Sequence, residues 1–301
     1  MSAVPLLLER DVSSVTDRAI RLAGTLPTAF LAVTTPAMAL YALRSEEWMP
    51  LGAHLIVLLA AAAVLLSPSR ALRPLRDWLP LAVGPFLYVE LRWLIAGVGR
   101  PHADALVQQW EHWLLPGNPS ATWAPSMPSL ALSEALHFAY ASYYLLIYVP
   151  PAILYLRARR RDFALTMLAL AIVYGVCFVT YLLFPVDGPR FIIGPASAPA
   201  GPVRELVLRL LAAGSSRGTA FPSSHVAASV VASLCALRVQ PRVGLTVLVL
   251  TAGLTLGTVY GGFHYGVDAL AGLIVGAISW LAATTAWRAL STPGAQSATA
   301  A

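Results

Sequence analysis

Two short segments of this chain carry residue types that can act together on a phosphate ester. In the first, Gly218–His225, serine and proline precede an apolar run and favour the start of a helix. The first turn of a helix has unpaired backbone N–H groups at the positive end of the helix dipole, and such a turn binds anions. Arg217 adds a fixed cation directly before this segment. Phosphate is the anion that suits this combination.

The second segment is Phe263–Asp268, whose main feature is the spacing of four between His264 and Asp268. On a helix these two side chains share a face. A carboxylate bonded to one ring nitrogen fixes the tautomer and presents the other nitrogen as a nucleophile or base. A protonated His225 can then give a proton to the leaving oxygen, and general acid catalysis of this kind contributes about 10²–10⁴ in rate.

Each of these features, taken singly, also has a structural interpretation. Serine caps are common at helix starts, and a histidine or aspartate at a helix end can simply meet the membrane interface. The combination favours chemistry, because the chain has only six histidines and 14 acidic residues. Asp268 also falls within an apolar run, where an ionisable side chain is costly unless it has a partner or a function.

The elements that must position these segments are predicted to be transmembrane helices. Hydrophobic residues make up 58% of the 301 residues and charged residues only 11%, and the mean hydropathy is +0.71, which is far from the balance of a soluble domain. Eight apolar runs approach or reach the length of a bilayer span: residues 26–43, 51–66, 78–98, 129–156, 163–184, 222–238, 243–261 and 265–287. We therefore predict an all-α polytopic membrane bundle, with kinks at Pro80, Pro85 and the Pro150–Pro151 pair.

The arginines predict the orientation of this bundle. All 20 basic residues are arginine, and we interpret their excess as a topology signal and not as nucleic-acid binding. Threading the chain through eight spans puts most of them, with both termini, on one side, which is therefore predicted to be cytoplasmic. His225 and His264 open the sixth and eighth runs. Both are predicted to lie on the opposite face, which is periplasmic, extracellular or lumenal.

The motifs resemble those of a known family. P-S-S-H and F-H-Y-G-V-D, with their histidines 39 residues apart, are similar to the second and third motifs of the type 2 phosphatidic acid phosphatase superfamily. The similarity is greatest to the branch of the inositol phosphorylceramide synthases, whose last motif resembles H-Y-x-x-D. It extends from about residue 106 to 285. It implies a six-helix core of the phosphatase type, with about two additional N-terminal transmembrane helices.

The resemblance also implies roles for individual residues. His264 matches the nucleophile that forms a phosphohistidine, Asp268 the acid that orients it, and His225 the proton donor to the leaving group. No cofactor and no metal are implied.

The phosphate-binding residues follow from the same resemblance. Arg190 matches the phosphate-binding arginine of the first motif, and Ser223 and Ser224 match positions whose N–H and hydroxyl groups hold phosphate oxygens. Two cations of the broader pattern are missing, because the chain has no lysine and Thr258 stands where an arginine is expected. Both losses also occur in the synthase-like branch. We propose Arg217 as the substitute and predict that its loss damages turnover about as much as the loss of Arg190.

Further polar residues are weaker candidates. His137, on one helix face with Glu134, either binds a headgroup or solvates the interface, and we favour the second interpretation. Asp187 either orients Arg190 or contacts a hydroxylated substrate. Tyr265, next to the proposed nucleophile, is a possible substrate contact.

The remaining histidines are given structural interpretations. His54 is expected to be an interfacial side chain. His102, His112 and Glu111 lack the spacing of zinc ligands, and their loop is expected to form a lid or an entrance.

The chain is predicted to divide into a cytoplasmic leader (1–25), N-terminal transmembrane helices (26–98), a catalytic membrane domain (99–288) and a disordered cytoplasmic tail (289–301). Within the catalytic domain, Leu106–Leu115 and Val203–Leu211 have apolar residues at helical spacing and are predicted to lie in the membrane interface.

Three functions fit these predictions. The leading one is headgroup transfer between lipids through a phosphohistidine, as the synthase-like branch implies. The second is a lipid phosphate phosphatase acting on phosphatidate or a prenyl phosphate. The third is a membrane protein that binds or transports a phosphorylated lipid without catalysis. All three have a lipid and the bilayer as partners and exclude nucleic acid.

Overall fold

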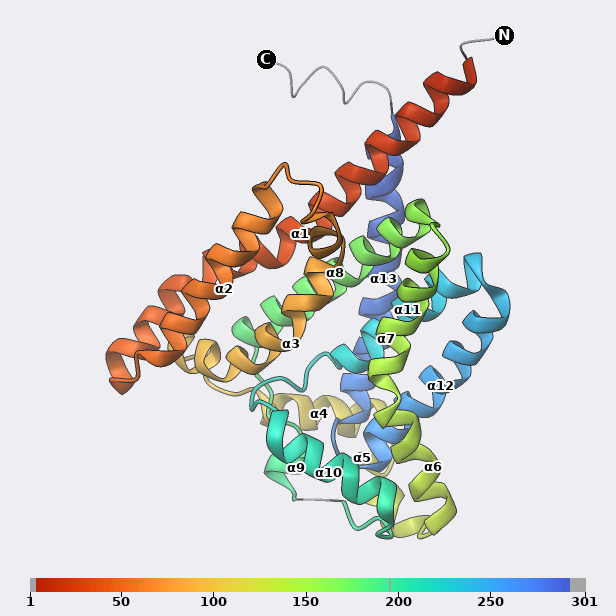
Figure 1. Cartoon of the computed structure of the whole chain (residues 1–301). Coiled ribbons are helices and arrows are strands. Elements are labelled where there is room, and N and C mark those ends of the chain that lie inside the picture. Colours follow the sequence, from red (N-terminus) through yellow and green to blue (C-terminus); the bar gives the residue numbers. More distant parts are fainter. Residues whose placement is uncertain (1–3, 195, 293–301) are drawn as a thin grey trace.

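The computed structural model describes residues 4–194 and 196–292 (Figure 1). Within these ranges the regular elements are the helices α1 (Val4–Ser45), α2 (Met49–Leu66), α3 (Arg73–Val98), α4 (Asp104–Leu114), α5 (Pro119–Ser126), α6 (Leu130–Ala141), α7 (Tyr143–Leu156), α8 (Arg160–Leu183), α9 (Pro189–Ile192), α10 (Pro202–Gly214), α11 (Ser224–Val239), α12 (Pro241–Tyr260) and α13 (Gly266–Ser291). Extended backbone pairs within them only at an isolated parallel bridge between Val186 and Thr219. The predicted all-α architecture is confirmed.

The eight predicted apolar runs correspond to helices of this bundle. Among the described residues, six helices, namely α1, α2, α3, α8, α12 and α13, are long and apolar enough to cross a membrane, and the bent pair of α6 and α7 makes a seventh candidate span. The sixth run forms α11, which is apolar but has only 16 residues. The chain is thus a polytopic integral membrane protein.

The fourth run bends at a different place from the one predicted. The break between α6 and α7 is 44° and falls at Ser142, whereas α7 continues through Pro150 and Pro151. The Ser142 hydroxyl donates a hydrogen bond to the Ala139 carbonyl at 2.7 Å, and a serine bonded back to the preceding turn favours bending.

Both ends of the described chain extend the helices beyond their predicted limits. Residues 4–25, predicted as a separate leader, are the first part of the continuous helix α1, in which Ala19 and Ala23 are buried. Burial against neighbouring helices stabilises this part as helix. Arg18 donates to the carbonyl of Leu290 at 2.9 Å, so α1 passes the end of α13 at this residue. The predicted tail is helical up to Ser291, and its part from residue 293 lies outside the described residues.

The bundle is organised around α8, which packs against α1, α3, α11 and α13 and is largely buried (Figure 1). The short helices α4, α5, α9 and α10 gather at the end of the bundle away from the junction of α1 and α13 (Figure 1). Helices α4 and α10 match the two stretches predicted to be helical outside the spans. This end also holds the segments that lead into α11 and α13.

The prediction of an interfacial His54 is wrong. Its side chain is fully buried between α1, α2 and α3, and Nδ1 lies 2.8 Å from a carboxylate oxygen of Glu90. Nε2 lies 3.0 Å from the carbonyl oxygen of Leu31. The pairing explains the burial, because a polar side chain inside a membrane bundle needs hydrogen-bond partners.

Candidate active site

The loop that contains Val186 runs beside the loop that contains Gly218 and Ala220. This places the first motif, with Arg190, close to the second motif, with His225. The Val186 N–H donates to the Gly218 carbonyl at 3.3 Å, and the Ala220 N–H donates to the Val186 carbonyl at 2.8 Å. Gly188 has a φ of 88°, and a Cβ at this position would lie 3.1 Å from the carbonyl oxygen of Phe263 and 3.0 Å from the Ala220 side chain. Glycine is therefore needed here, because only glycine combines this φ with so close an approach.

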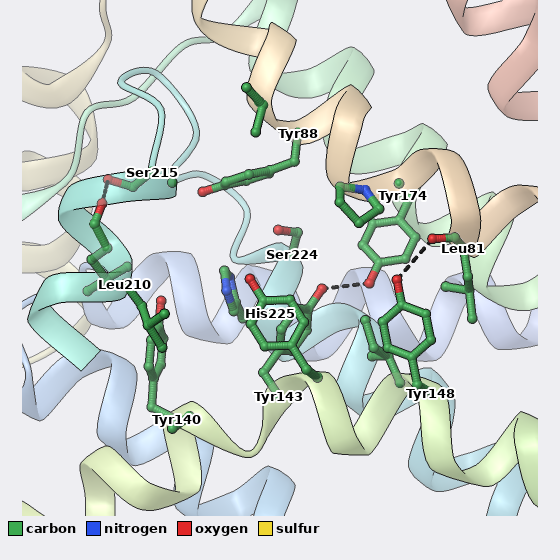
Figure 2. Close-up of a pocket in the computed structure, with 18 of the residues that line it drawn as sticks. Leu81, Tyr88, Tyr140, Tyr143, Tyr148, Tyr174, Leu210, Ser215, Ser224 and His225 are labelled. Atoms are coloured by element: carbon green, nitrogen blue, oxygen red, sulfur yellow. Dashed lines mark hydrogen bonds between the residues drawn. The ribbon is translucent and has the colours of Figure 1, made fainter. Parts of the chain in front are cut away.

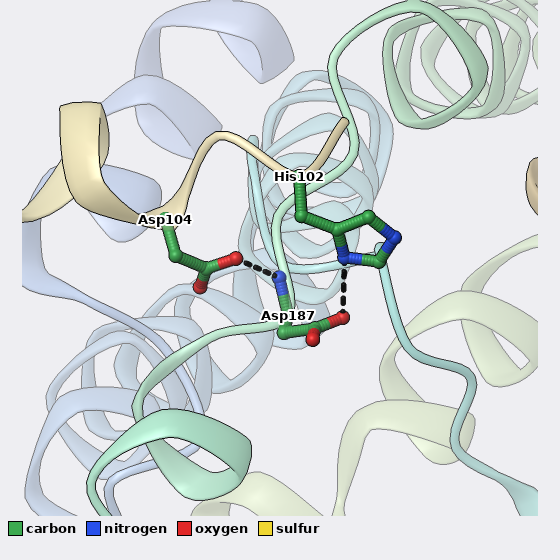
Figure 3. A group of neighbouring side chains, drawn as sticks. All are labelled: His102, Asp104 and Asp187. Atoms are coloured by element: carbon green, nitrogen blue, oxygen red, sulfur yellow. Dashed lines mark hydrogen bonds and ion pairs between the residues drawn. The ribbon is translucent and has the colours of Figure 1, made fainter. Parts of the chain in front are cut away.

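A carboxylate from α4 fixes the first of these loops. The Asp104 oxygens accept hydrogen bonds from the backbone N–H group of Asp187 (Figure 3) and from that of Gly188, each at 2.9 Å. Asp187 in turn accepts from the Gly218 N–H and from Nδ1 of His102, both at 2.9 Å. Ligand atoms of the two aspartates and His102 lie within 4.8 Å of one another, which is a spacing that a cation can use. These hydrogen bonds explain why the three side chains lie together: they hold the two loops in place relative to each other.

His225 lies in the first turn of α11 among tyrosines. Its ring stacks on Tyr140 with a centroid separation of 5.2 Å and an interplanar angle of 20°. The ring of Tyr143 lies 4.2 Å away, and that of Tyr88 6.5 Å away in an edge contact (Figure 2). The aromatic rings hold the imidazole in one orientation at the wall of a cavity.

His264 is a neighbour of His225, and the centroids of the two imidazole rings are 6.2 Å apart. Its Nδ1 is 2.9 Å from the carbonyl oxygen of Ala220, so Nδ1 carries the proton and donates it there. In the part of the chain that the structure describes, Nε2 has no hydrogen-bond partner. Nε2 is therefore the nitrogen available as a nucleophile.

Asp268 is close to His264, although not through the helical turn that the spacing suggested. Helix α13 begins at Gly266 with Tyr265 as its N-cap, so His264 precedes the helix. Oδ2 of Asp268 accepts the Tyr265 N–H at 2.8 Å in a capping box and lies 3.5 Å from Nδ1 of His264. The Ala220 carbonyl thus makes the shorter contact with the imidazole, and Asp268 supports it from slightly farther away.

The surroundings of His264 favour its neutral form. Burial lowers the pKa of His264 to about 4; the hydrogen bond to the Ala220 carbonyl opposes this shift, and the positive charge of Arg190 adds to it. An imidazole with this pKa is unprotonated at neutral pH, as nucleophilic attack requires.

The two serines of the second motif differ in what they offer a ligand. Ser223 is the N-cap of α11, where its hydroxyl accepts the Val226 N–H and its own N–H donates to the Asp268 carbonyl at 3.0 Å. The N–H of Ser224 donates to the hydroxyl of Tyr181 at 3.1 Å. Both backbone N–H groups predicted to hold phosphate therefore already have partners. The Ser224 side chain lines the cavity beside His225 (Figure 2).

The two arginines lie at different depths. Arg190 is half-buried and donates to the Ser215 hydroxyl, and burial lowers the pKa of its guanidinium. The Arg217 side chain is 64% exposed, with Nε 3.6 Å from Oδ2 of Asp187. Their guanidinium groups lie 4.4 and 5.1 Å from the ring centroid of Phe191. Arg190 is thus the inner cation of the site and Arg217 the outer one.

Two of the weaker candidates have structural surroundings. Tyr265 is fully buried, and its hydroxyl accepts a hydrogen bond from Gln108 at 2.9 Å. His137 is buried and donates from Nδ1 to the Ser133 carbonyl at 2.6 Å. Its neighbour Glu134 accepts the N–H groups at the start of α10. Neither Tyr265 nor His137 lines the cavity beside His225, which favours the structural interpretation of both.

The cavity beside His225 has a volume of about 190 Å³ and extends between α3, α7, α8 and α10 (Figure 2). Its walls are mostly apolar and aromatic, with tyrosine hydroxyls at intervals. Val89 of α3 and Tyr144 of α7 line it and are themselves exposed, so the cavity opens between these two helices toward the side of the bundle. This is the direction in which a lipid would lie in a membrane.

Several residues of the site were not found from the sequence. Asp104 and Glu111 bind backbone N–H groups that lead into the motifs, and Glu111 accepts the N–H of Val267 at 3.0 Å. Acidic residues facing inward on a short amphipathic helix were the available signal. Tyr88 and Tyr174 line the cavity from α3 and α8, and nothing in their local sequence separates them from ordinary core aromatics.

The two histidines and the inner arginine thus lie at one end of a membrane-spanning bundle, next to a lateral apolar cavity. A family model described as the PAP2 superfamily matches residues 105–282, and the chain belongs to this superfamily. Its activity is accordingly of the lipid phosphatase or phosphotransferase type. Neither a curated protein nor a solved structure matches the chain.

Proposed function

We propose that this protein transfers a phosphorylated headgroup from one lipid to a lipid alcohol through a phosphohistidine on His264, in the manner of the inositol phosphorylceramide synthases. The observation that carries the proposal is the 6.2 Å separation of the two histidine rings, of which that of His225 lines a lateral apolar cavity. The proposed nucleophile and the proposed proton carrier then lie beside an apolar space that opens toward the side of the bundle.

The two half-reactions balance with the two histidines alone. In the first, Nε2 of His264 attacks phosphorus, the bond to the leaving alkoxide oxygen breaks, and that oxygen takes the proton of His225. In the second, the acceptor hydroxyl attacks phosphorus, its proton returns to His225, and the phosphorus–nitrogen bond breaks. Arg190, half-buried beside the histidines, balances the charge on the phosphoryl oxygens in both steps.

The position of Thr258 supports the synthase-like branch. Thr258 is fully buried, and its carbonyl accepts the N–H groups of Phe263 and His264 at 2.9 and 3.1 Å. These contacts are made by the backbone and do not depend on the side chain, and threonine brings no charge to the position where the broader pattern has an arginine. Charge balance falls to Arg190 inside the site and to Arg217 at its exposed edge.

The apolar cavity favours a lipid acceptor over water. An acceptor alcohol that enters between α3 and α7 arrives beside His225 through walls that are mostly apolar and aromatic, and exclusion of water protects a phosphohistidine from hydrolysis.

We also propose that the motif-bearing end of the bundle lies outside the cytoplasm. Helix α1 passes the end of α13 at the opposite end, through Arg18 and Leu290, in keeping with the distribution of arginines. Single cysteines placed at Ser291 and at Arg217 in a cysteine-free variant should react with an impermeant maleimide from the cytoplasmic and the external side, respectively. The reverse pattern would overturn this orientation.

The function is tested by giving purified protein labelled phosphatidylinositol, phosphatidate or a prenyl phosphate, with and without ceramide or diacylglycerol. We expect new phospholipid to form only when alcohol is present, and acid-labile phosphate to appear on the wild type and not on His264→Ala. Free phosphate at an unchanged rate with alcohol present would establish a phosphatase instead. Absence of histidine labelling across the panel would favour a lipid-binding protein.

A further inference from the structure

The cavity beside His225 adjoins a second void. The smaller void is lined by Leu26, Pro27 and Phe30 of α1, together with residues of α3 and α8. Gly84, Tyr174 and Phe178 line both spaces. The two spaces therefore meet at these three residues, and together they mark a path from His225 toward α1 whose inner void has a volume of about 20 Å³.

Gly84 is the open point on this path. A Cβ built at Gly84 meets nothing within 4 Å, so the space beside its backbone is empty. Tyr174 is held by a hydrogen bond of 2.6 Å between its hydroxyl and that of Tyr143. The passage between the two voids thus runs beside a residue without a side chain, next to an aromatic residue that is fixed in place.

Prolines account for the looseness of packing along the path. Pro27 lies inside α1 and Pro80 and Pro85 lie inside α3, and each lines one of the two spaces. Proline inside a helix removes a backbone hydrogen bond and displaces the preceding turn, which prevents close packing of neighbouring helices.

We propose that the hydrocarbon chain of the substrate lipid runs from His225 past Gly84 into the void between α1, α3 and α8, so that Gly84 sets which chain lengths are accepted. Helices α1 and α3 precede the segment that matches the superfamily, which begins at residue 105. The N-terminal helices are therefore the specificity element of this enzyme. The inference rests on the proposed action on lipid phosphoesters.

The path is apolar and confined, as a chain-binding site must be. Loss of one methylene contact in an apolar pocket costs about 10–200-fold in discrimination, so a block at Gly84 acts on long chains and spares short ones. A leucine at Gly84 would fill the empty space beside the backbone and close the passage, because no atom lies within 4 Å of a Cβ at this position.

The test compares kcat/KM for phosphatidates with acyl chains of eight to eighteen carbons in wild type, Gly84→Ala and Gly84→Leu. Gly84→Leu should lower the value for the longest chains by about 10–100-fold and that for the shortest by less than about threefold, with Gly84→Ala in between. Gly52→Leu is the matched control, because Gly52 of α2 also has nothing within 4 Å of its Cβ and lines neither void. An equal loss at all lengths, or no change at any, would overturn the inference.

A second measurement does not depend on turnover. A long-chain phosphatidate with a terminal diazirine is crosslinked to the protein and the labelled peptide is mapped. Label on Leu26–Phe30 or on the Gly175–Phe178 part of α8, lost in Gly84→Leu, supports the path even if no lipid is turned over. Label confined to the lipid-facing surface of α2 would overturn the inferred path. Turnover without label on α1 or α8 would also overturn the path but would leave the proposed function standing.

Discussion

The imidazole rings of His225 and His264 lie with centroids 6.2 Å apart, and only the second of them has a ring nitrogen bonded to the backbone. The Ala220 carbonyl holds Nδ1 of His264, whereas His225 is held by the faces of Tyr140 and Tyr143. The two histidines are thus fixed by different means, one by a hydrogen bond and one by stacking. His264 thus has a defined tautomer, whereas the ring nitrogens of His225 have no hydrogen-bond partner among the described residues.

Substrates with different leaving groups distinguish the proposed roles of His225 and His264. His225→Ala should lower turnover of a lipid phosphoester by about 10²–10⁴ and turnover of an aryl phosphate much less, because an aryl oxide leaves without a proton. His264→Ala should abolish both reactions and the phosphohistidine. Steady-state rates on the two substrates give the comparison. Equal losses on both substrates in His225→Ala would contradict its role as proton donor.

The acid limb of activity should fall far below the usual range for histidine. Burial, aided by Arg190, lowers the pKa of His264 to about 4 from its ordinary value of 6.5. The unfolded chain binds this proton near 6.5 and the native chain only near 4, so this group makes the native state less stable as pH falls from 6.5 toward 4. The pH profile of kcat/KM reports on the free enzyme. It should therefore show no loss of activity from protonation of His264 until the pH falls to about 4.

Arg190→Gln gives the matched test of this pKa. Removing the positive charge should move the acid limb to higher pH, since Arg190 is one cause of the lowered value. The limb of Arg217→Gln should stay where it is in the wild type. An acid limb near 6.5 in the wild type would show that His264 is not desolvated as the structure indicates.

The two arginines should differ in effect, in contrast to the equal effect predicted from the sequence. Arg190 is half-buried, whereas the Arg217 side chain is 64% exposed and its charge is screened by solvent. We expect Arg190→Ala to lower kcat/KM by about 10²–10³ and Arg217→Ala by about tenfold or less, mostly through KM. Kinetics at two salt concentrations check this, because only the Arg217 contribution should weaken with salt.

Asp104 should hold the first-motif loop and support catalysis without touching substrate. Its two oxygens accept the N–H groups of Asp187 and Gly188, and leaving buried donors unpaired costs about 1–3 kcal/mol each. Asp104→Ala should therefore lower the thermal unfolding temperature in detergent together with kcat, and Asp104→Asn should recover part of both. Glu205→Ala, which removes an exposed carboxylate on α10, is the control and should change neither.

Much of the fold was readable from the chain because a bilayer imposes a simple rule. Long apolar runs must form helices in lipid, since every backbone polar group needs a partner there, and each predicted run became a helix. The motifs also predicted His225 and His264 as site residues, and the family resemblance added Arg190. These are properties of residue type and order, and they do not depend on how the helices pack.

What the tertiary structure decided was every relationship between segments distant in sequence. Asp268 forms a capping box with Tyr265 and so lies beside His264. The Ala220 carbonyl accepts a hydrogen bond from Nδ1 of His264, and Asp104 accepts hydrogen bonds from a loop more than 80 residues away. No local pattern specifies such contacts, because each depends on where another helix ends. For the same reason the sequence did not predict the pairing of His54 with Glu90 or the two voids that meet at Gly84. Several helices together enclose a void, and no single stretch of sequence contains it.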